Sequence, residues 1–136
     1  MNDSISYRIL LVDDYEPWRR CVYSRLQERP GMQVFGEAAN GFDAIHKASE
    51  LKPDLVLLDI QLPDISGIEV SSRIGHAIPG MKIVFATQNN DPDLARVALS
   101  NGAYGLLLKA DAQSELLDAI EMVLRGERFV SRRVRA

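Results

Sequence analysis

Four short apolar runs each end in a polar residue, and this pattern constrains the fold more than any other feature of the chain. The runs occupy residues 7–12, 54–58, 82–86 and 104–108, and they are followed by Asp13, Asp59, Thr87 and Lys109. Short runs of this kind are typical of parallel strands that are buried on both faces. Because the carboxyl ends of parallel strands form one edge where ligands bind, the four polar side chains are predicted to converge there.

Strand-like and helix-like segments alternate along the whole chain. Strands are predicted over residues 7–13, 33–37, 54–58, 82–86 and 104–108, and each is followed by a helix. Pro17 fits the first turn of the first helix, Pro30-Gly31 ends it, and Asn40 is a candidate N-cap of the second. Strict alternation favours a doubly wound α/β fold, with a five-stranded parallel sheet in the flavodoxin-like order 2-1-3-4-5.

Length and charge limit the possible functions. A chain of 136 residues that is 46% hydrophobic suits one globular domain, and a net charge of −3 argues against binding a nucleic-acid backbone. Five arginines crowd residues 125–135, and we interpret them as a solvated helix end and the start of a linker. The predicted division is a domain over residues 1–126 and a basic tail over residues 127–136.

Two further features indicate the compartment. Cys21 is the single cysteine, so it forms no internal disulfide, which suits a reducing compartment. The apolar runs are far shorter than the roughly 20 residues of a membrane span, and the first residues lack the pattern of a signal peptide. We therefore expect a cytoplasmic protein that does not bind membranes.

The polar residues at the strand ends match the needs of one type of chemistry. Asp13 and Asp14, taken alone, also fit helix capping, whereas Asp59 does not, because Pro63 and Gly67 place the next helix several residues later. Two carboxylates about 4 Å apart repel by roughly 1 to 4 kcal/mol, so three of them call for a cation or a raised pKa. Acidic metal ligands, a hydroxyl from Thr87 and the ammonium of Lys109 are the parts that phosphoryl transfer requires.

These residues and their flanking motifs resemble the receiver domain of bacterial two-component response regulators, with its CheY-like fold. The resemblance covers most of the chain. It rests on residues 11–14, 53–59, Leu62-Pro63, Ser66-Gly67, Thr87, and residues 102–105 leading to Lys109. The segments 37–41 and 126–131 are more particularly similar to the LuxR-type (NarL/FixJ-like) branch, whose members carry a helix-turn-helix domain after the receiver.

The resemblance implies a role for each site residue. Asp59 accepts a phosphoryl group from a sensor histidine kinase, while Lys109 and Thr87 contact that group. Mg²⁺ is held by Asp13, Asp14, Asp59 and the backbone carbonyl of Gln61. Phosphorylation then changes the face of the fourth helix, fifth strand and fifth helix, with possible homodimer formation, and DNA is reached only through a downstream output domain. Such a protein is not an enzyme for a separate substrate and catalyses only its own phosphorylation and dephosphorylation.

Other functions remain as alternatives. One is a degenerate receiver that acts only as a protein-binding module. A second is a phosphatase of the haloacid dehalogenase type, but Gln61 stands where such enzymes usually carry a second aspartate. A flavin or dinucleotide carrier lacks support because no glycine-rich loop follows the first strand. The sequence also departs from the receiver pattern, since Leu106 replaces a frequent aromatic residue, and Tyr104 is expected on the same face by strand alternation.

Overall fold

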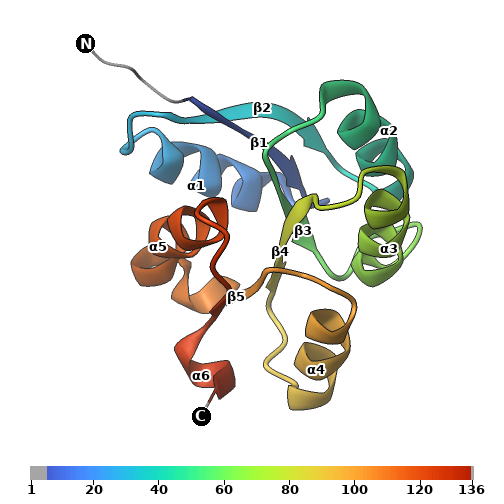
Figure 1. Cartoon of the computed structure of the whole chain (residues 1–136). Coiled ribbons are helices and arrows are strands. Elements are labelled where there is room, and N and C mark those ends of the chain that lie inside the picture. Colours follow the sequence, from blue (N-terminus) through green and yellow to red (C-terminus); the bar gives the residue numbers. More distant parts are fainter. Residues whose placement is uncertain (1–5, 136) are drawn as a thin grey trace.

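The computed structural model of the chain describes residues 6–135 as a parallel sheet with helices on both faces (Figure 1). The strand order is β2-β1-β3-β4-β5-β6, and every neighbouring pair is parallel. The strands are β1 (Tyr7–Val12), β2 (Met32–Ala38), β3 (Leu55–Asp59), β4 (Lys82–Thr87), β5 (Gly105–Leu108) and β6 (Phe129–Val130). The predicted doubly wound α/β fold with the order 2-1-3-4-5 is therefore confirmed.

The helices lie in two layers. The helices are α1 (Glu16–Leu26), α2 (Gly41–Leu51), α3 (Gly67–Ala77), α4 (Pro92–Ser100), α5 (Ala112–Leu124) and α6 (Arg132–Arg135), with a 3₁₀ turn, η1 (Lys109–Asp111), between β5 and α5. Figure 1 shows α1 and α5 over one face of the sheet and α2, α3 and α4 over the other. Among residues 6–135, none of the helices is long and apolar enough to cross a membrane.

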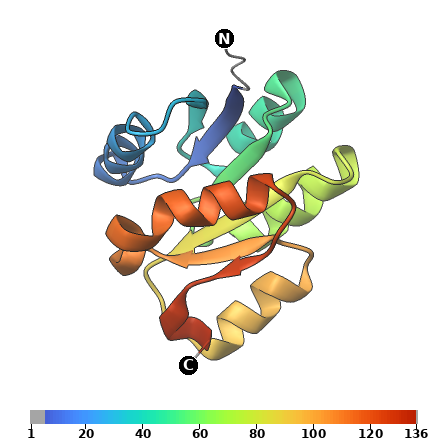
Figure 2. The ribbon, with the colours of Figure 1, turned by 60° about the vertical axis from the view of Figure 1, so that its left-hand side comes forward.

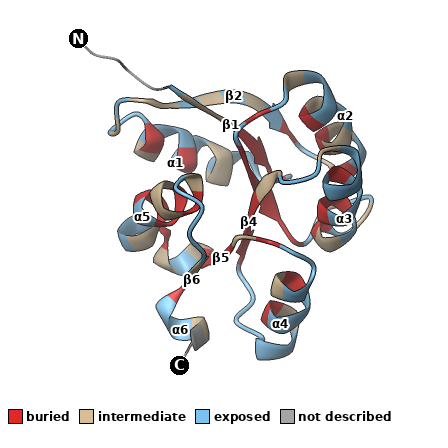
Figure 3. Ribbon diagram, viewed as in Figure 1, coloured by how far each residue is buried: buried red, intermediate tan, exposed pale blue. Residues whose placement is uncertain are grey.

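Alternation along the central strands divides the core between the two faces. On β1, Leu10 and Val12 pack into the cluster beneath α2, α3 and α4, whereas Ile9 and Leu11 pack into the cluster beneath α1 and α5. All five residues of β3 are buried, as expected for a strand that is covered on both sides (Figure 3). This double burial fixes where the strands end, and so it fixes the edge at which their terminal polar residues meet.

A sixth strand extends the five-stranded sheet that the sequence predicts. Phe129 donates its backbone N–H to the carbonyl of Tyr104, and Ser131 donates its own to the carbonyl of Leu106. These bonds satisfy backbone groups on the outer edge of β5 that would otherwise stay unpaired. A strand of two residues is too short to show an alternating pattern, so the sequence gives no sign of it.

The expectation that Tyr104 shares a face with Leu106 is wrong. Leu106 is buried in the cluster beneath α2, α3 and α4, whereas Tyr104 packs against the cluster on the side of α1 and α5. The Tyr104 ring has two cationic neighbours, Lys82 and Arg128, at 5.7 and 5.5 Å from its centroid. Because β5 begins at Gly105, Tyr104 precedes the strand, and strand alternation does not extend to it.

Candidate functional site: an acidic cluster at the carboxyl edge of the sheet

A cavity of about 390 Å³ opens at the carboxyl edge of the sheet. It lies where the loops after β1, β3, β4 and β5 meet, which is the usual ligand position in open parallel sheets. The lining side chains come from all four loops: Asp13, Asp14, Tyr15, Asp59, Gln61, Gln88 and Lys109. The structure therefore brings together all but one of the site residues predicted from the sequence, the exception being Thr87.

The turn after β1 places the first acidic pair. Asp13 extends the β1–β2 hydrogen bonding by donating its N–H to the carbonyl of Ala38, and its side chain accepts a bond of 2.9 Å from the N–H of Tyr15. Tyr15 is the residue that precedes α1, and the helix start has no side-chain cap. Helix capping is therefore not the role of Asp13 or Asp14. Asp13 is buried, while Asp14 is exposed at the mouth of the cavity.

The loop after β3 folds tightly around Asp59. The N–H of Gln61 donates to Asp59 Oδ1 at 3.2 Å, and the N–H of Gly67 donates to the carbonyl of Ile60 at 2.6 Å. A Cβ atom at Gly67 would lie only 2.1 Å from the Asp59 carbonyl oxygen. Only glycine allows the start of α3 to approach the end of β3 this closely, and this contact fixes the backbone of Asp59.

Charge in the cluster is unbalanced. One carboxylate oxygen from each of Asp13, Asp14 and Asp59 lies within 4.8 Å of the other two. Lys109 Nζ lies 2.6 Å from Asp13 Oδ2 and 3.6 Å from Asp59 Oδ2, so one ammonium serves two buried carboxylates. Burial raises the pKa of Asp59 to about 6, and the negative charge of Asp13 adds to this effect, while Lys109 opposes it.

This donor set fits a small divalent cation. Magnesium prefers hard oxygen ligands and usually takes one or two protein carboxylates. The three aspartates supply such oxygens at close range, and Gln61, whose backbone carbonyl is a further candidate ligand, lines the same cavity. The cluster could therefore bind a metal ion, which would offset the charge that Lys109 leaves uncompensated.

Thr87 occupies the predicted strand end, but its hydroxyl is turned to the following loop. Thr87 is the last residue of β4 and is buried, and its Oγ1 accepts a bond of 3.0 Å from the N–H of Asn89. The cavity is lined instead by its neighbour Gln88. Reaching a ligand in the cavity would require the Thr87 hydroxyl to exchange this loop contact for a new one.

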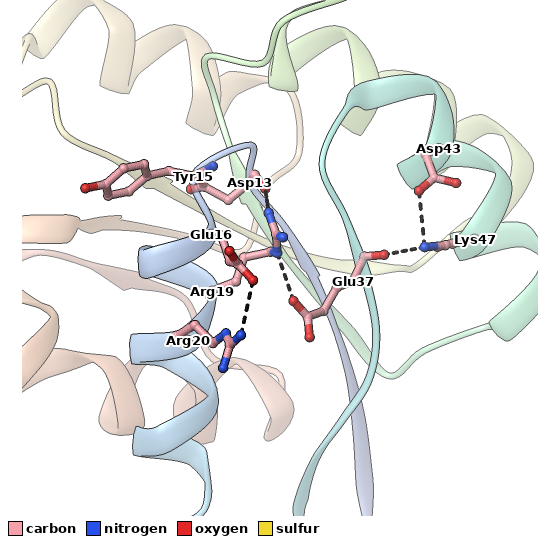
Figure 4. A network of polar contacts seen from close by, with 8 residues as sticks. All are labelled: Asp13, Tyr15, Glu16, Arg19, Arg20, Glu37, Asp43 and Lys47. Carbon is pink, nitrogen blue, oxygen red and sulfur yellow. Dashed lines mark hydrogen bonds and ion pairs between the residues drawn. The ribbon is translucent and has the colours of Figure 1, made fainter.

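Two residues that the sequence did not single out for the site support it from α1. The ring of Trp18 lies 5.2 Å from Lys109 Nζ, within the range of a cation–π contact. Arg19 donates from Nη1 to the Asp13 carbonyl at 2.5 Å and from Nε to Glu37 on β2 at 2.8 Å (Figure 4). In the sequence, Trp18 belongs to the apolar face of a helix and Arg19 stands alone, so neither carries a signal of these contacts.

The β2 end of this network reaches α2. Lys47 donates to the backbone carbonyl of Glu37 and forms an ion pair of 3.2 Å with Asp43 (Figure 4). The turn that carries Asp13 is thereby joined through Arg19 to β2 and α2. These contacts hold Asp13 through its backbone carbonyl, while its carboxylate contacts Tyr15 and Lys109 at the cavity.

Comparison with known proteins agrees with this geometry. Residues 9–121 match the response regulator receiver domain. Response regulator GacA of Pseudomonas viridiflava is 35% identical over 124 residues, which are 91% of this chain and 58% of GacA. Response regulator protein VraR of Staphylococcus epidermidis is 36% identical over 123 residues, which are 90% of this chain and 59% of VraR. The chain thus spans less than two thirds of the length of these relatives.

A solved structure shows the same likeness in three dimensions. The crystal structure of a LuxR-family two-component response regulator from an Aurantimonas species superposes with a TM-score of 0.92 at 33% identity, covering 96% of this chain and 93% of that one. The match extends over nearly all of both chains. The fold, the cavity and these relatives together show that this chain belongs to the response regulator receiver domain family.

Proposed function

We propose that Asp59 accepts a phosphoryl group from a phosphohistidine of a sensor histidine kinase. The observation that supports this most directly is the buried carboxylate of Asp59, held 3.6 Å from Lys109 and beside two further acidic side chains. One Asp59 oxygen attacks phosphorus, so that an O–P bond forms while the P–N bond breaks and its electron pair stays on the imidazole. The product is an acyl phosphate on Asp59.

Each neighbour has a part in this transfer. Lys109 is already within 3.6 Å of Asp59 Oδ2 and would pair with the incoming phosphoryl oxygens as a compact charge. Asp13, Asp14, Asp59 and the Gln61 carbonyl would hold Mg²⁺, which supplies positive charge against the phosphoryl oxygens. The hydroxyl of Thr87 would leave the N–H of Asn89 and donate to the phosphoryl group.

The proposed output is a change of the surface formed by α4, β5 and α5. New bonds from Thr87 and Lys109 to the phosphoryl group would draw the loop after β4 inward and favour one of two conformations. Leu106 stands where receivers frequently carry an aromatic residue, and it is fully buried. No aromatic ring moves at this position, so the change between the two conformations would be more graded. Homodimer formation on phosphorylation and control of DNA through a downstream domain, as in a transcription regulator, belong to the same proposal.

We assign no reaction on a separate substrate to this site, and its catalysis would be limited to its own phosphorylation and dephosphorylation. Gln61 stands two residues after Asp59, where a phosphatase would need a general acid, and an amide cannot donate a proton in that role. A cytoplasmic location is part of the proposal, because the lone Cys21 suits a reducing compartment.

Self-phosphorylation by a small donor tests this function. With acetyl phosphate and Mg²⁺, we expect intact-mass analysis to show one added phosphoryl group on the wild-type chain and none on Asp59→Asn. Asp93→Asn, an exposed position on α4, is the matched control and should label normally. Removing Mg²⁺ with a chelator should abolish labelling. Equal labelling of wild type and Asp59→Asn, or no labelling of wild type, would refute the proposal.

A further inference from the structure

The segment after α5 is bonded to β5 along the length of that strand. In register, Phe129 lies beside Gly105 and Val130 beside Leu106, and the segment follows the outer edge of the sheet (Figure 2). Before this strand, Arg128 donates to the carbonyl of Ala103 at 3.0 Å. Within the basic tail predicted over residues 127–136, residues 128–134 therefore pack against the edge of the sheet, and from here on "the tail" means these residues.

Ser131 makes the contact of the tail that lies next to Lys109 along the chain. It is fully buried, with 0% of its surface exposed. Its hydroxyl accepts a bond of 2.8 Å from the backbone N–H of Leu108 and donates one of 2.7 Å to Glu115 Oε1 on α5. Leu108 is the residue immediately before Lys109, so this hydroxyl fixes the backbone from which the Lys109 side chain extends.

Arg133 holds the backbone on the other side of Lys109. Its guanidinium contacts both oxygens of Asp111, with a shortest distance of 2.6 Å, and Asp111 ends the 3₁₀ turn that Lys109 begins. The following residue, Val134, packs against the core cluster beneath α2, α3 and α4. The tail thus contacts the chain directly before Lys109 through Ser131 and two residues after it through Arg133.

We propose that Ser131, assisted by Arg133, is a positioning residue for Lys109, so that docking of the tail and occupation of the phosphoryl site favour each other. The proposal rests on the proposed function of Asp59. A lysine placed in advance meets an anionic group without first losing conformational freedom, and releasing the tail would remove that advantage. Because such coupling is reciprocal, a ligand that engages Lys109 must also hold the tail more firmly.

Beryllofluoride with Mg²⁺, which imitates the acyl phosphate, provides the binding test. Trp18 is the only tryptophan and its ring lies 5.2 Å from Lys109 Nζ, so its fluorescence reports on this lysine. We expect Ser131→Ala to weaken beryllofluoride affinity by about three- to tenfold, the usual range for one lost buried hydrogen bond. Ser71→Ala, which removes a buried hydroxyl from α3, is the matched control and should bind like the wild type.

The reciprocal effect is measured at the tail. Trypsin can cut after Arg132 and Arg133. We expect beryllofluoride to slow this cleavage in the wild type by about the same factor as Ser131→Ala weakens beryllofluoride affinity. In Ser131→Ala the slowing should largely disappear. Arg133→Gln, at a side chain that is 59% exposed, provides a second variant that should fold, and it should reduce beryllofluoride affinity in the same direction.

The outcomes distinguish this proposal from the one on which it rests. If wild-type chain shows no response to beryllofluoride and no phosphorylation, the proposed function fails. If wild type binds beryllofluoride and both Ser131→Ala and Arg133→Gln bind it with wild-type affinity, the positioning role is overturned. Unchanged tryptic cleavage of the wild-type tail upon beryllofluoride binding overturns it as well.

Discussion

The two ends of the 3₁₀ turn at residues 109–111 carry opposite arrangements of charge. At the first end, the side chain of Lys109 is 10% exposed, and its ammonium is shared by Asp13 and Asp59. At the other end, the guanidinium of Arg133 contacts both carboxylate oxygens of Asp111. The pKa of Asp59 is raised to about 6 by burial and by neighbouring negative charge, whereas the hydrogen bond from Arg133 lowers the pKa of Asp111.

This contrast shows how one short segment serves two purposes. Excess negative charge in a buried place is unstable by itself, and it is relieved when a metal ion or a proton binds. A balanced pair at the surface needs no ligand and fixes the path of the chain. We therefore assign ligand binding to the Lys109 end, which we call the open end, and attachment of the tail to the Asp111 end, the closed end. Four predictions test this assignment.

Gly67→Ala should have the largest effect, because it disturbs the backbone of the open end. The added Cβ would stand 2.1 Å from the Asp59 carbonyl oxygen and 2.8 Å from Ile60 Cα, so main-chain atoms would have to move. We expect the free energy of unfolding to fall by about 3 kcal/mol or more, at or above the usual cost of overpacking. Urea unfolding measures the loss, and self-phosphorylation should slow in parallel because Asp59 is displaced.

Gly75→Ala is the control for this substitution. Gly75 lies within α3 and has no atom within 4 Å of an added Cβ. Alanine is the better helix former, so the free energy of unfolding should rise by about 0.5 to 1 kcal/mol. A loss of stability at Gly75 equal to that at Gly67 would show that the tight approach to Asp59 is not the cause.

Asp59→Asn should stabilise the metal-free protein, and the gain should depend on pH. The folded-state pKa of Asp59, about 6, lies above its ordinary value of 3.8. Ionising Asp59 therefore does not reduce the stability of the wild type below about pH 3.8, and the wild type loses stability as pH rises through 6. The difference of about two units between the folded and ordinary pKa of Asp59 corresponds to about 3 kcal/mol. This is the largest increase in the free energy of unfolding expected from asparagine near pH 8. Thermal unfolding in a chelator from pH 4 to 8 measures the gain.

The closed end supplies the opposite sign for comparison. The pKa of Asp111 is lowered by Arg133, so its contribution to stability is present above its ordinary pKa and is lost as pH falls through the folded-state value. Asp111→Asn should therefore destabilise the chain at neutral pH, and the difference should close in acid. If the stability gained from Asp59→Asn did not depend on pH, the comparison would fail, because it depends on excess negative charge at the open end.

Asp14→Ala should have a smaller effect, confined to metal binding. Asp14 is the exposed member of the acidic cluster, so its loss should leave folding almost unchanged. One hard anionic ligand is removed, and we expect the Mg²⁺ concentration that supports half-maximal phosphorylation to rise by about tenfold. Asp64→Ala is the matched control, because Asp64 accepts bonds from Gly41 and Phe42 and does not line the cavity. An unchanged Mg²⁺ requirement in Asp14→Ala would exclude Asp14 as a ligand.

The sequence predicts the open end well because hydrophobic runs determine it. Buried strands must end where polar residues begin, so Asp13, Asp59 and Lys109 could be placed at one edge without knowledge of any distance. The orientation of Thr87 was not accessible in this way. Its hydroxyl bonds to the N–H of Asn89, and this choice depends on the path of a loop rather than on a repeating pattern.

The contacts at the closed end cannot be predicted from sequence patterns, and the reason is physical. The five arginines in residues 125–135 indicate only a solvated segment, and a strand of two residues has no period. The burial of Ser131 depends on a partner 23 residues away, the N–H of Leu108, and local composition does not reveal such a contact. The face on which Tyr104 lies was also not predictable, because Tyr104 precedes β5, which begins at Gly105, and strand alternation does not reach it.

Trp18→Leu should have the smallest effect on phosphorylation, since the one contact it removes from Lys109 is a cation–π contact. A cation–π contact of this kind contributes about 0.5 to 1 kcal/mol, which corresponds to a two- to fivefold slower self-phosphorylation. Trp18→Phe keeps an aromatic face and should recover most of the rate, while Tyr15→Leu, an exposed aromatic on the cavity rim, controls for general loss of an aromatic side chain. If leucine and phenylalanine at position 18 gave equal rates, the ring would only fill space, and the position of Lys109 would depend on Asp13, Asp59 and the backbone alone.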